Sequence, residues 1–205
     1  VYEANVTGTR RLLSAIATLP SPAAFNHVST AYVAGSRDGV IREEIVAPPE
    51  FNNPYESSKH ACETMVRDVL GDCGTPWRIF RPSIIIGHSV THRVSSEFGF
   101  YKVLTTFGQL GVGARVAIAP ITLPFKRDAT IDLIPVDIVV DEMLALIGAG
   151  PASFGKVFHL SNEYPLTVAD IFFGIAPLAG LPIDHEQPKS ARERSTLDVL
   201  ATRAV

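Results

Sequence analysis

Two short runs of β-forming, largely apolar residues with a helical segment between them constrain the fold of this chain most strongly. The runs cover residues 25–33 and 79–86, and each is closed by a glycine. Continuous runs of this kind are typical of parallel strands buried on both faces, which do not show strict alternation. Residues 55–70 follow a proline and carry apolar side chains at helical spacing, which predicts a helix that crosses from one strand to the next.

The rest of the chain continues the same alternation of helices and strands. Apolar residues at helical spacing predict a first helix over 2–19, and a later helix is predicted over 138–147 with Asp137 as its N-cap. Residues 156–161 form a third apolar run. Helix, strand, helix, strand, helix, strand is the order that right-handed βαβ crossovers produce, so we predict an α/β fold with a parallel sheet.

Two segments fall outside this alternation and are predicted to form a small substrate-binding lobe. The core comprises residues 1–88 and 131–161, and the lobe comprises 89–130 and 162–205. The lobe segments follow the carboxyl ends of strands, where open α/β sheets bind their ligands. Three strands make a poor sheet and no glycine-rich phosphate turn follows any of them. We therefore expect further strands, with that turn, to precede Val1.

Composition excludes several classes of protein. Eighteen Lys and Arg residues against 21 Asp and Glu give a formal charge of −3, which argues against nucleic acid as a partner. The two cysteines lack metal or disulfide spacing and the six histidines lack a ligand pattern, so we predict no metal and a reducing, cytoplasmic location. Polar residues and prolines interrupt the apolar stretch 103–125, which argues against a transmembrane helix.

Tyr55 and Lys59 are the first candidates for chemistry. They are four positions apart on the predicted helix 55–70, hence on one face and about one turn apart. A neighbouring cation stabilises phenolate and lowers the pKa of a phenol toward neutrality, which suits proton transfer. This spacing is weak evidence alone, because a surface Tyr and Lys on an amphipathic helix would look the same.

Ser29 and Thr30 are the second candidates. They end the first predicted strand, where parallel sheets present reactive side chains, and a hydroxyl there can donate a hydrogen bond to a substrate carbonyl. The simpler interpretation of these two hydroxyls is ordinary turn capping.

The order of four motifs along the chain resembles the extended short-chain dehydrogenase/reductase superfamily after its dinucleotide-binding glycines. The motifs are Asn5-Val6-Thr7-Gly8-Thr9, His27-Val28-Ser29-Thr30-Ala31-Tyr32-Val33-Ala34-Gly35, Asn53-Pro54-Tyr55-Glu56-Ser57-Ser58-Lys59 and Phe80-Arg81-Pro82-Ser83-Ile84-Ile85-Ile86-Gly87. The second and fourth motifs, with Ile134-Pro135-Val136-Asp137, are most similar to the thioester reductase and fatty acyl reductase (male sterility) branch. The resemblance covers about residues 2–161 and implies the carboxyl-side part of a doubly wound Rossmann-type sheet.

The resemblance also implies roles for individual residues. Thr30 matches the hydroxyl that orients the substrate carbonyl, and Tyr55 matches the proton donor. Lys59 matches the residue that lowers the pKa of the phenol and holds the nicotinamide ribose, and Asn5 matches a helix Asn near the cofactor. A further group matches the segment that packs beside the nicotinamide through backbone groups: Pro82, Ser83, Ile84 and Ile85. The branch favours NADP, with NAD as the alternative.

The expected function is reduction of a carbonyl or an acyl thioester, with the acyl group small or bound to a carrier module. Within the same superfamily, the alternatives are a nucleotide-sugar epimerase or dehydratase and a hydroxysteroid-type dehydrogenase. Residues 94–125 hold only Lys102 and Arg115 as cations, which argues mildly against binding a sugar diphosphate. A non-catalytic dinucleotide sensor is the alternative from another class, although a sensor needs no proton donor.

Overall fold

The computed structural model divides the chain into two compact units. It describes residues 2–20, 23–94, 100–102, 104–105 and 129–175. The first unit joins Val1–Thr91 to Ile134–Asn162, and the second joins His92–Leu133 to Glu163–Val205. Most of the predicted lobe, 89–130 and 162–205, lies outside the described residues, as does most of the apolar stretch 103–125. The role of that lobe therefore stays a prediction.

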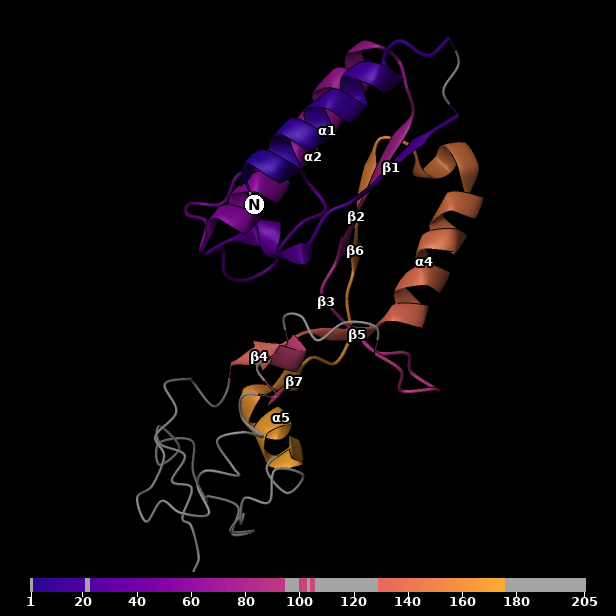
Figure 1. Ribbon diagram of the computed structural model, residues 1–205. Helices are drawn as coiled ribbons and strands as arrows, with labels where there is room; N and C mark the ends of the chain where they lie inside the picture. The colour runs from indigo at the N-terminus through magenta and orange to yellow at the C-terminus, as the bar shows by residue number, and fades with distance from the viewer. Residues whose placement is uncertain (1, 21–22, 95–99, 103, 106–128, 176–205) are drawn as a thin grey trace, which may run out of the picture. The chain divides into compact units, whose positions relative to one another are not determined.

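A parallel three-stranded sheet forms the centre of the first unit (Figure 1). Its strands are β1 (Phe25–Val28), β2 (Trp77–Pro82) and β6 (Lys156–Leu160), in the order β1-β2-β6. Phe25 pairs with Trp77 of β2, and Phe80 pairs with Phe158 of β6, so all three strands run in one direction. The predicted α/β fold with a parallel sheet is confirmed.

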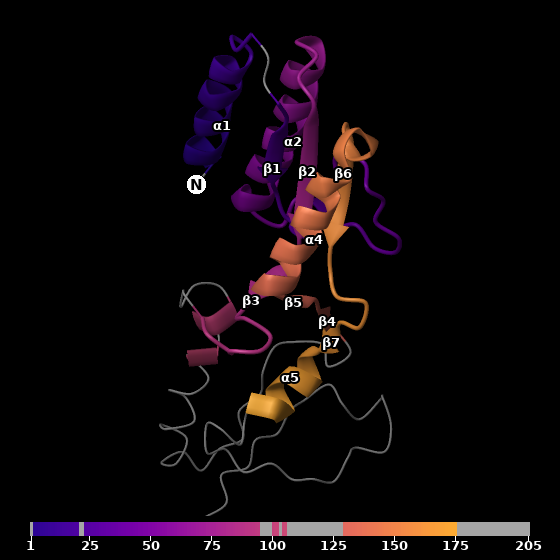
Figure 2. The ribbon, with the colours of Figure 1, turned by 90° about the vertical axis from the view of Figure 1, so that its right-hand side faces the viewer.

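Helices cover both faces of this sheet. The helices α1 (Tyr2–Ile16) and α2 (Pro54–Asp72) lie side by side on one face, and α4 (Val136–Gly148) lies on the other. Figure 2 shows the same arrangement from the side, with α4 in front of the strands. Because the central strand β2 lies between two helical layers, five of its six residues are buried, including Ile79 and Phe80.

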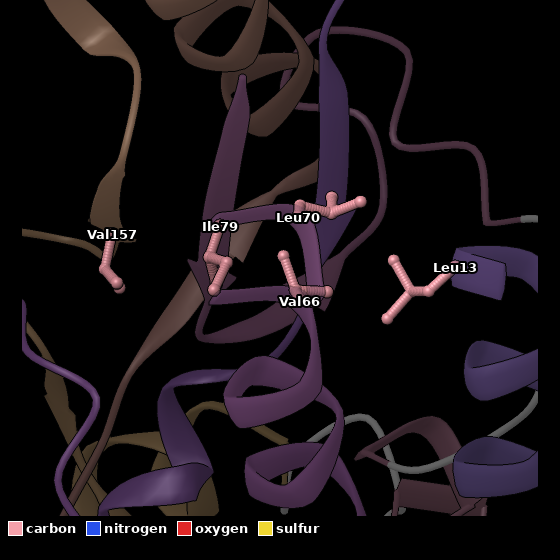
Figure 3. Packing of buried hydrophobic residues seen from close by; sticks show 5 residues of the cluster. All are labelled: Leu13, Val66, Leu70, Ile79 and Val157. Carbon is pink, nitrogen blue, oxygen red and sulfur yellow. The ribbon is translucent and has the colours of Figure 1, made fainter. Parts of the chain in front are cut away.

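Each face of the sheet has its own apolar core. Residues from α1, α2, β2 and β6 form the first core, shown in Figure 3: Leu13, Val66, Leu70, Ile79 and Val157. Residues from β2, β6 and α4 with its preceding strand form the second: Phe80, Ile134, Val139 and Leu160. Successive residues of β2 thus alternate between the two cores, which fixes the register of this central strand.

Both β-rich runs are shorter as strands than predicted. The first ends at Val28, because the Thr30 side chain accepts a hydrogen bond from the Tyr32 amide (3.3 Å) and caps the 3-10 helix η1 (Ala31–Ala34). The second divides at Ser83 into β2 and β3 (Ile84–Ile86), which pairs with β5 (Leu133–Pro135). The division follows Pro82, which has no amide hydrogen to donate to a ladder.

The prediction that Asp137 caps α4 is wrong. The N-cap of α4 is Pro135, which makes no side-chain cap hydrogen bond, and Asp137 lies within the first turn. Its carboxylate accepts hydrogen bonds from the amide and hydroxyl of Ser89 instead. The Asp137 carboxylate therefore bonds to Ser89, 48 positions away in the sequence, and not to the amides at the start of its own helix.

In the second unit, β4 (Thr130–Ile131) pairs antiparallel with β7 (Leu166–Thr167), and α5 (Val168–Ile175) follows directly. The 3-10 helix η2 (Gly150–Ser153) belongs to the first unit and precedes β6. Among the described residues, no helix combines the length and apolar character needed to cross a membrane.

Gly35 closes the loop that connects η1 to α2. Its φ of +56° and ψ of −132° lie in a region that side chains rarely adopt. A Cβ at this position would lie 2.3 Å from the Glu50 carbonyl oxygen and 2.7 Å from Pro48. The Ser36 amide donates a 2.9 Å hydrogen bond to the same Glu50 oxygen. The beginning of the loop, at Gly35, is therefore in close contact with its end, at Glu50.

We therefore expect Gly35→Ala to lower the free energy of unfolding by about 2 kcal/mol or more, because backbone strain adds to a steric clash. Gly39→Ala is the matched control in the same loop. Its φ is +81° but nothing lies within 4 Å of the added Cβ, so only strain applies and the loss should be about 1 kcal/mol. Urea unfolding of both variants measures the difference. Equal losses would contradict the close approach at Gly35.

Candidate active site

Thr30, Tyr55 and Lys59 meet at the carboxyl end of β1. Thr30 follows this strand by two residues, and Tyr55 and Lys59 occupy the first two turns of α2. The Thr30 hydroxyl lies near enough to Tyr55 to influence the pKa of its phenol. The Lys59 ammonium donates a 2.7 Å hydrogen bond to the Val28 carbonyl oxygen. A hydroxyl, a phenol and an amine are therefore gathered at one end of the sheet, where open α/β folds bind ligands.

The three groups differ in their access to solvent. Thr30 is buried, with 6% of its surface exposed, whereas Tyr55 is 44% exposed. A ligand can thus approach the phenol, while the Thr30 hydroxyl is held by the bond that it accepts from the backbone of η1. Turn capping, the simpler interpretation of Thr30, is therefore present in the structure.

The amino end of α2 fixes the backbone of Tyr55. The Asn53 side chain accepts a hydrogen bond from the Glu56 amide (3.0 Å), and the buried Glu56 carboxylate accepts bonds from the Asn52 amide (2.8 Å) and the Asn53 side chain (2.9 Å). This reciprocal arrangement resembles a capping box, with the Asn52 amide in place of the Asn53 amide as the donor to Glu56. Sequence reasoning did not single out Glu56, although its position three residues after Asn53 was a usable signal.

The pKa of Tyr55 is raised, opposite to the sequence-based expectation. Burial of the phenol is the main cause, and the nearby Thr30 side chain acts in the other direction. Burial also lowers the pKa of Lys59, against the opposing effects of Cys62 and Glu63. The expected lowering of the Tyr55 pKa by Lys59 is not seen in this structure, in which the ammonium is bonded to the Val28 carbonyl.

Asn5 joins the site through another residue. Its side-chain amide donates a 2.9 Å hydrogen bond to the Ser58 hydroxyl, which donates a 2.7 Å bond to the Tyr55 carbonyl oxygen. The structure therefore links Asn5 of α1 to the helical turn that carries Tyr55. Sequence reasoning expected Asn5 near the cofactor and did not identify Ser58 as its partner.

The segment Pro82–Ile85 lies at the carboxyl end of β2, the strand next to β1. Pro82 and Ser83 are buried, and the Ser83 amide donates to the Leu160 carbonyl oxygen at 2.9 Å. Ile84 is half-buried and Ile85 is 41% exposed. In this segment Ile85 is the large apolar residue best placed to meet a ligand.

Buried polar atoms without a partner lie on the same strand as the site. Within the described ranges, His27 Nε2 and Ser29 Oγ lack a hydrogen-bond partner. Burial, with a smaller contribution from Lys59, lowers the pKa of His27 to about 4, so this imidazole is neutral at physiological pH. Among the described residues, no three His, Cys, Asp or Glu side chains form a cluster that could hold a metal ion.

A parallel sheet with helices on both faces and a hydroxyl, a phenol and an amine at its carboxyl end defines a class of protein. It is the class of Rossmann-type extended short-chain dehydrogenases/reductases. Within this class, residues 1–143 match the family described as "Male sterility protein". Since this match covers more than half of the chain, the chain belongs to that family.

Individual relatives agree with this assignment. The aldehyde reductase lnaA of Aspergillus flavus is 23% identical over 167 residues, which cover 77% of this chain and 15% of that protein. The terminal R domain of the myxalamid PKS-NRPS biosynthetic pathway is 31% identical with a TM-score of 0.63, covering 83% of this chain and 41% of that one. The chain thus spans less than half the length of both relatives.

A more distant structure supports the fold alone. The UDP-glucuronic acid 4-epimerase from Bacillus cereus, solved in complex with UDP-glucuronic acid and NAD, is 20% identical with a TM-score of 0.66. The match covers 87% of this chain and 52% of the epimerase. Reductases and epimerases therefore share this architecture, and the substrate has to be argued from the site.

Proposed function

We propose that the chain is part of an NADP-dependent reductase that reduces a carbonyl or an acyl thioester, with Tyr55 as the proton donor. The observation that carries the proposal is the placement of Thr30, Tyr55 and Lys59 together at the carboxyl end of β1. A phenol that is accessible and lies near a buried hydroxyl can deliver a proton to a substrate oxygen that both groups contact.

The residues present fit a nicotinamide dinucleotide. The unpartnered Ser29 hydroxyl lies one residue before Thr30, and Ile85 offers an exposed apolar side chain at the end of the next strand. We propose that Lys59 holds the ribose and that the segment Pro82–Ile85 lies against the nicotinamide, with Asn5 supporting the site through Ser58. When bound, the dinucleotide supplies the hydride.

The roles of the chain's own groups follow from their chemistry. Thr30 donates a hydrogen bond to the substrate carbonyl oxygen and orients it, and Tyr55 donates its proton as negative charge develops on that oxygen. The carbon–oxygen π bond breaks as the carbon accepts the hydride. With a thioester, the resulting hemithioacetal releases a thiol and leaves an aldehyde. A second hydride transfer would give an alcohol.

Relatives support an acyl substrate carried by another module. One relative is named an aldehyde reductase, and another is the terminal R domain of a PKS-NRPS pathway. Reduction of a carrier-bound thioester is consistent with both names, because it yields an aldehyde that can be reduced again. The two cysteines are free, which fits the proposed cytoplasmic location.

The direct test is oxidation of NADPH by the complete protein in the presence of acyl thioesters. We expect turnover with acyl thioesters or the matching aldehydes, and a lower kcat/KM with NADH than with NADPH. Nucleotide sugars serve as the comparison substrates. Turnover of those sugars without turnover of thioesters would favour an epimerase or dehydratase, and cofactor binding without any turnover would favour a sensor.

A further inference from the structure

A hydrogen-bonded link between Ser89 and Asp137 holds the chain that follows β3. The Ser89 amide donates to Asp137 Oδ1 at 2.8 Å, and its hydroxyl donates to Oδ2 at 2.5 Å. These two bonds, with a smaller contribution from His88, lower the pKa of Asp137, so the group is a carboxylate at neutral pH. Hydrogen bonds to an ionised acceptor are stronger than those between neutral groups.

His88 organises the same turn. Its Nδ1 accepts hydrogen bonds from the amides of Val90 (3.1 Å) and Thr91 (3.5 Å) and lies 3.6 Å from Asp137 Oδ2. The residues after β3 therefore form a defined turn in which the backbone of Ser89 faces the carboxylate.

The segment that this turn follows is short. In the part of the chain that the structure describes, β3 has three residues and pairs with the three residues of β5 in a two-stranded sheet, an arrangement that is marginal by itself. β5 leads directly into α4, whose N-cap Pro135 offers no side-chain hydrogen bond. β3 pairs with β5, β5 leads into α4, and the bonds from Asp137 of α4 to Ser89 return to the turn after β3. These contacts form a closed ring of connected segments.

We propose that Ser89 and Asp137 are positioning residues that hold the backbone of Ile84–Ile86 in the conformation that binds the nicotinamide end of the dinucleotide. The inference rests on the proposed function, because it takes this segment as a wall of the cofactor site. Neither residue needs to touch the cofactor. Their effect passes through the closed ring to Ile85, the exposed member of the segment.

The test compares Ser89→Ala, Asp137→Asn and the double variant in the complete protein. In the cofactor-free protein, hydrogen exchange of peptides covering 84–91 should become faster. The Kd and the KM for NADPH should both rise about tenfold, while kcat at saturating NADPH and the KM for the acyl substrate stay nearly constant. Because both residues form one link, the double variant should bind NADPH no more weakly than the weaker-binding single variant. Ser89→Thr keeps the hydroxyl and should bind NADPH with nearly the affinity of the wild-type protein.

Asp68→Asn is the matched control. It makes the same isosteric change in an exposed ion pair with Arg67 on α2, and it should alter neither the exchange of 84–91 nor the Kd for NADPH. Unchanged exchange and NADPH affinity in the Ser89 and Asp137 variants would overturn the inference while leaving the proposed function intact. The inference would also be overturned if the loss of NADPH affinity in these variants were fully explained by a lower Tm, because a general loss of stability would then be the cause. A wild-type protein that binds neither NADPH nor NADH would refute both.

Discussion

Tyr55→Phe is expected to lower kcat for thioester or aldehyde reduction by about 10²- to 10⁴-fold, because the substitution removes the proposed proton donor. The aromatic ring remains and packs as before, so affinity for NADPH and the Tm should change little. Steady-state oxidation of NADPH measures the loss of rate, and NADPH fluorescence measures the affinity. Loss of rate without loss of cofactor binding would assign the defect to the chemical step.

Tyr2→Phe is the matched control for this substitution. Tyr2 lies at the start of α1 and is 48% exposed, close to the 44% of Tyr55, and its hydroxyl has no proposed role. Its removal should leave kcat unchanged. Activity retained by Tyr55→Phe would contradict the mechanism, and activity lost equally in both variants would point to a general defect of folding.

The raised pKa of Tyr55 is consistent with the reductive direction. A general acid must be protonated in order to donate, and burial favours the uncharged phenol over the phenolate. The reverse reaction needs phenolate as a base, and burial opposes that form. The environment of Tyr55 therefore keeps the donor protonated at neutral pH, but donation leaves a phenolate, which burial disfavours. Stabilisation of that phenolate stays a proposed role for Lys59.

The sequence contained enough information to predict the three strands of the parallel sheet and the three helices that cover it. Continuous apolar runs with helical segments between them identified β1, β2 and β6 as parallel strands, because strands buried on both faces need apolar side chains in succession. The end of β1 was misjudged because Tyr32 and Val33 favour strands. The hydroxyl of Thr30 instead caps a 3-10 turn, and a local hydrogen bond outweighs intrinsic β propensity there.

Contacts between distant residues could not be predicted in the same way. The spacing of Tyr55 and Lys59 was visible because one helical turn joins them, but Ser89 and Asp137 are far apart in the sequence. Asp137 was assigned as a local cap, since a carboxylate at a helix start usually has that role. The pKa of Tyr55 depends on burial, which a motif does not encode.

The pair formed by Glu63 and Arg81 is the clearest feature that sequence reasoning did not identify. Arg81 donates from Nε and Nη2 to the two carboxylate oxygens of Glu63, at 2.9 and 2.7 Å. The side chains are 2% and 0% exposed. Glu63 lies on the apolar face of α2 between Cys62 and Val66, where a charge is normally excluded.

Arg81 also anchors the loop before α2. Its Nη2 donates to the Glu44 carbonyl oxygen at 2.9 Å, and its Nη1 lies 3.3 Å from His159 Nε2. The Glu43 carboxylate accepts from the His159 amide at 2.7 Å. The buried pair thus connects α2 and β2 to the loop that leads to Tyr55.

Glu63→Gln is expected to lower the free energy of unfolding by about 3 kcal/mol or more, because it leaves the Arg81 guanidinium buried without its counter-ion. That is a large share of the roughly 5–15 kcal/mol that stabilises a typical domain. Urea unfolding of the protein measures the change. Asp68→Asn makes the equivalent change in the exposed pair with Arg67 and should cost less than about 1 kcal/mol.

A double variant separates the buried charge from the loss of contacts. Glu63→Met with Arg81→Met removes both ions and keeps apolar volume, so it should be more stable than Glu63→Gln despite the additional substitution. If the double variant is instead the less stable one, the bonds from Arg81 to the loop carry more of the stability than the pairing of charges does. A loss below about 1 kcal/mol in Glu63→Gln would mean that water reaches the guanidinium, contrary to its burial between α2 and β2.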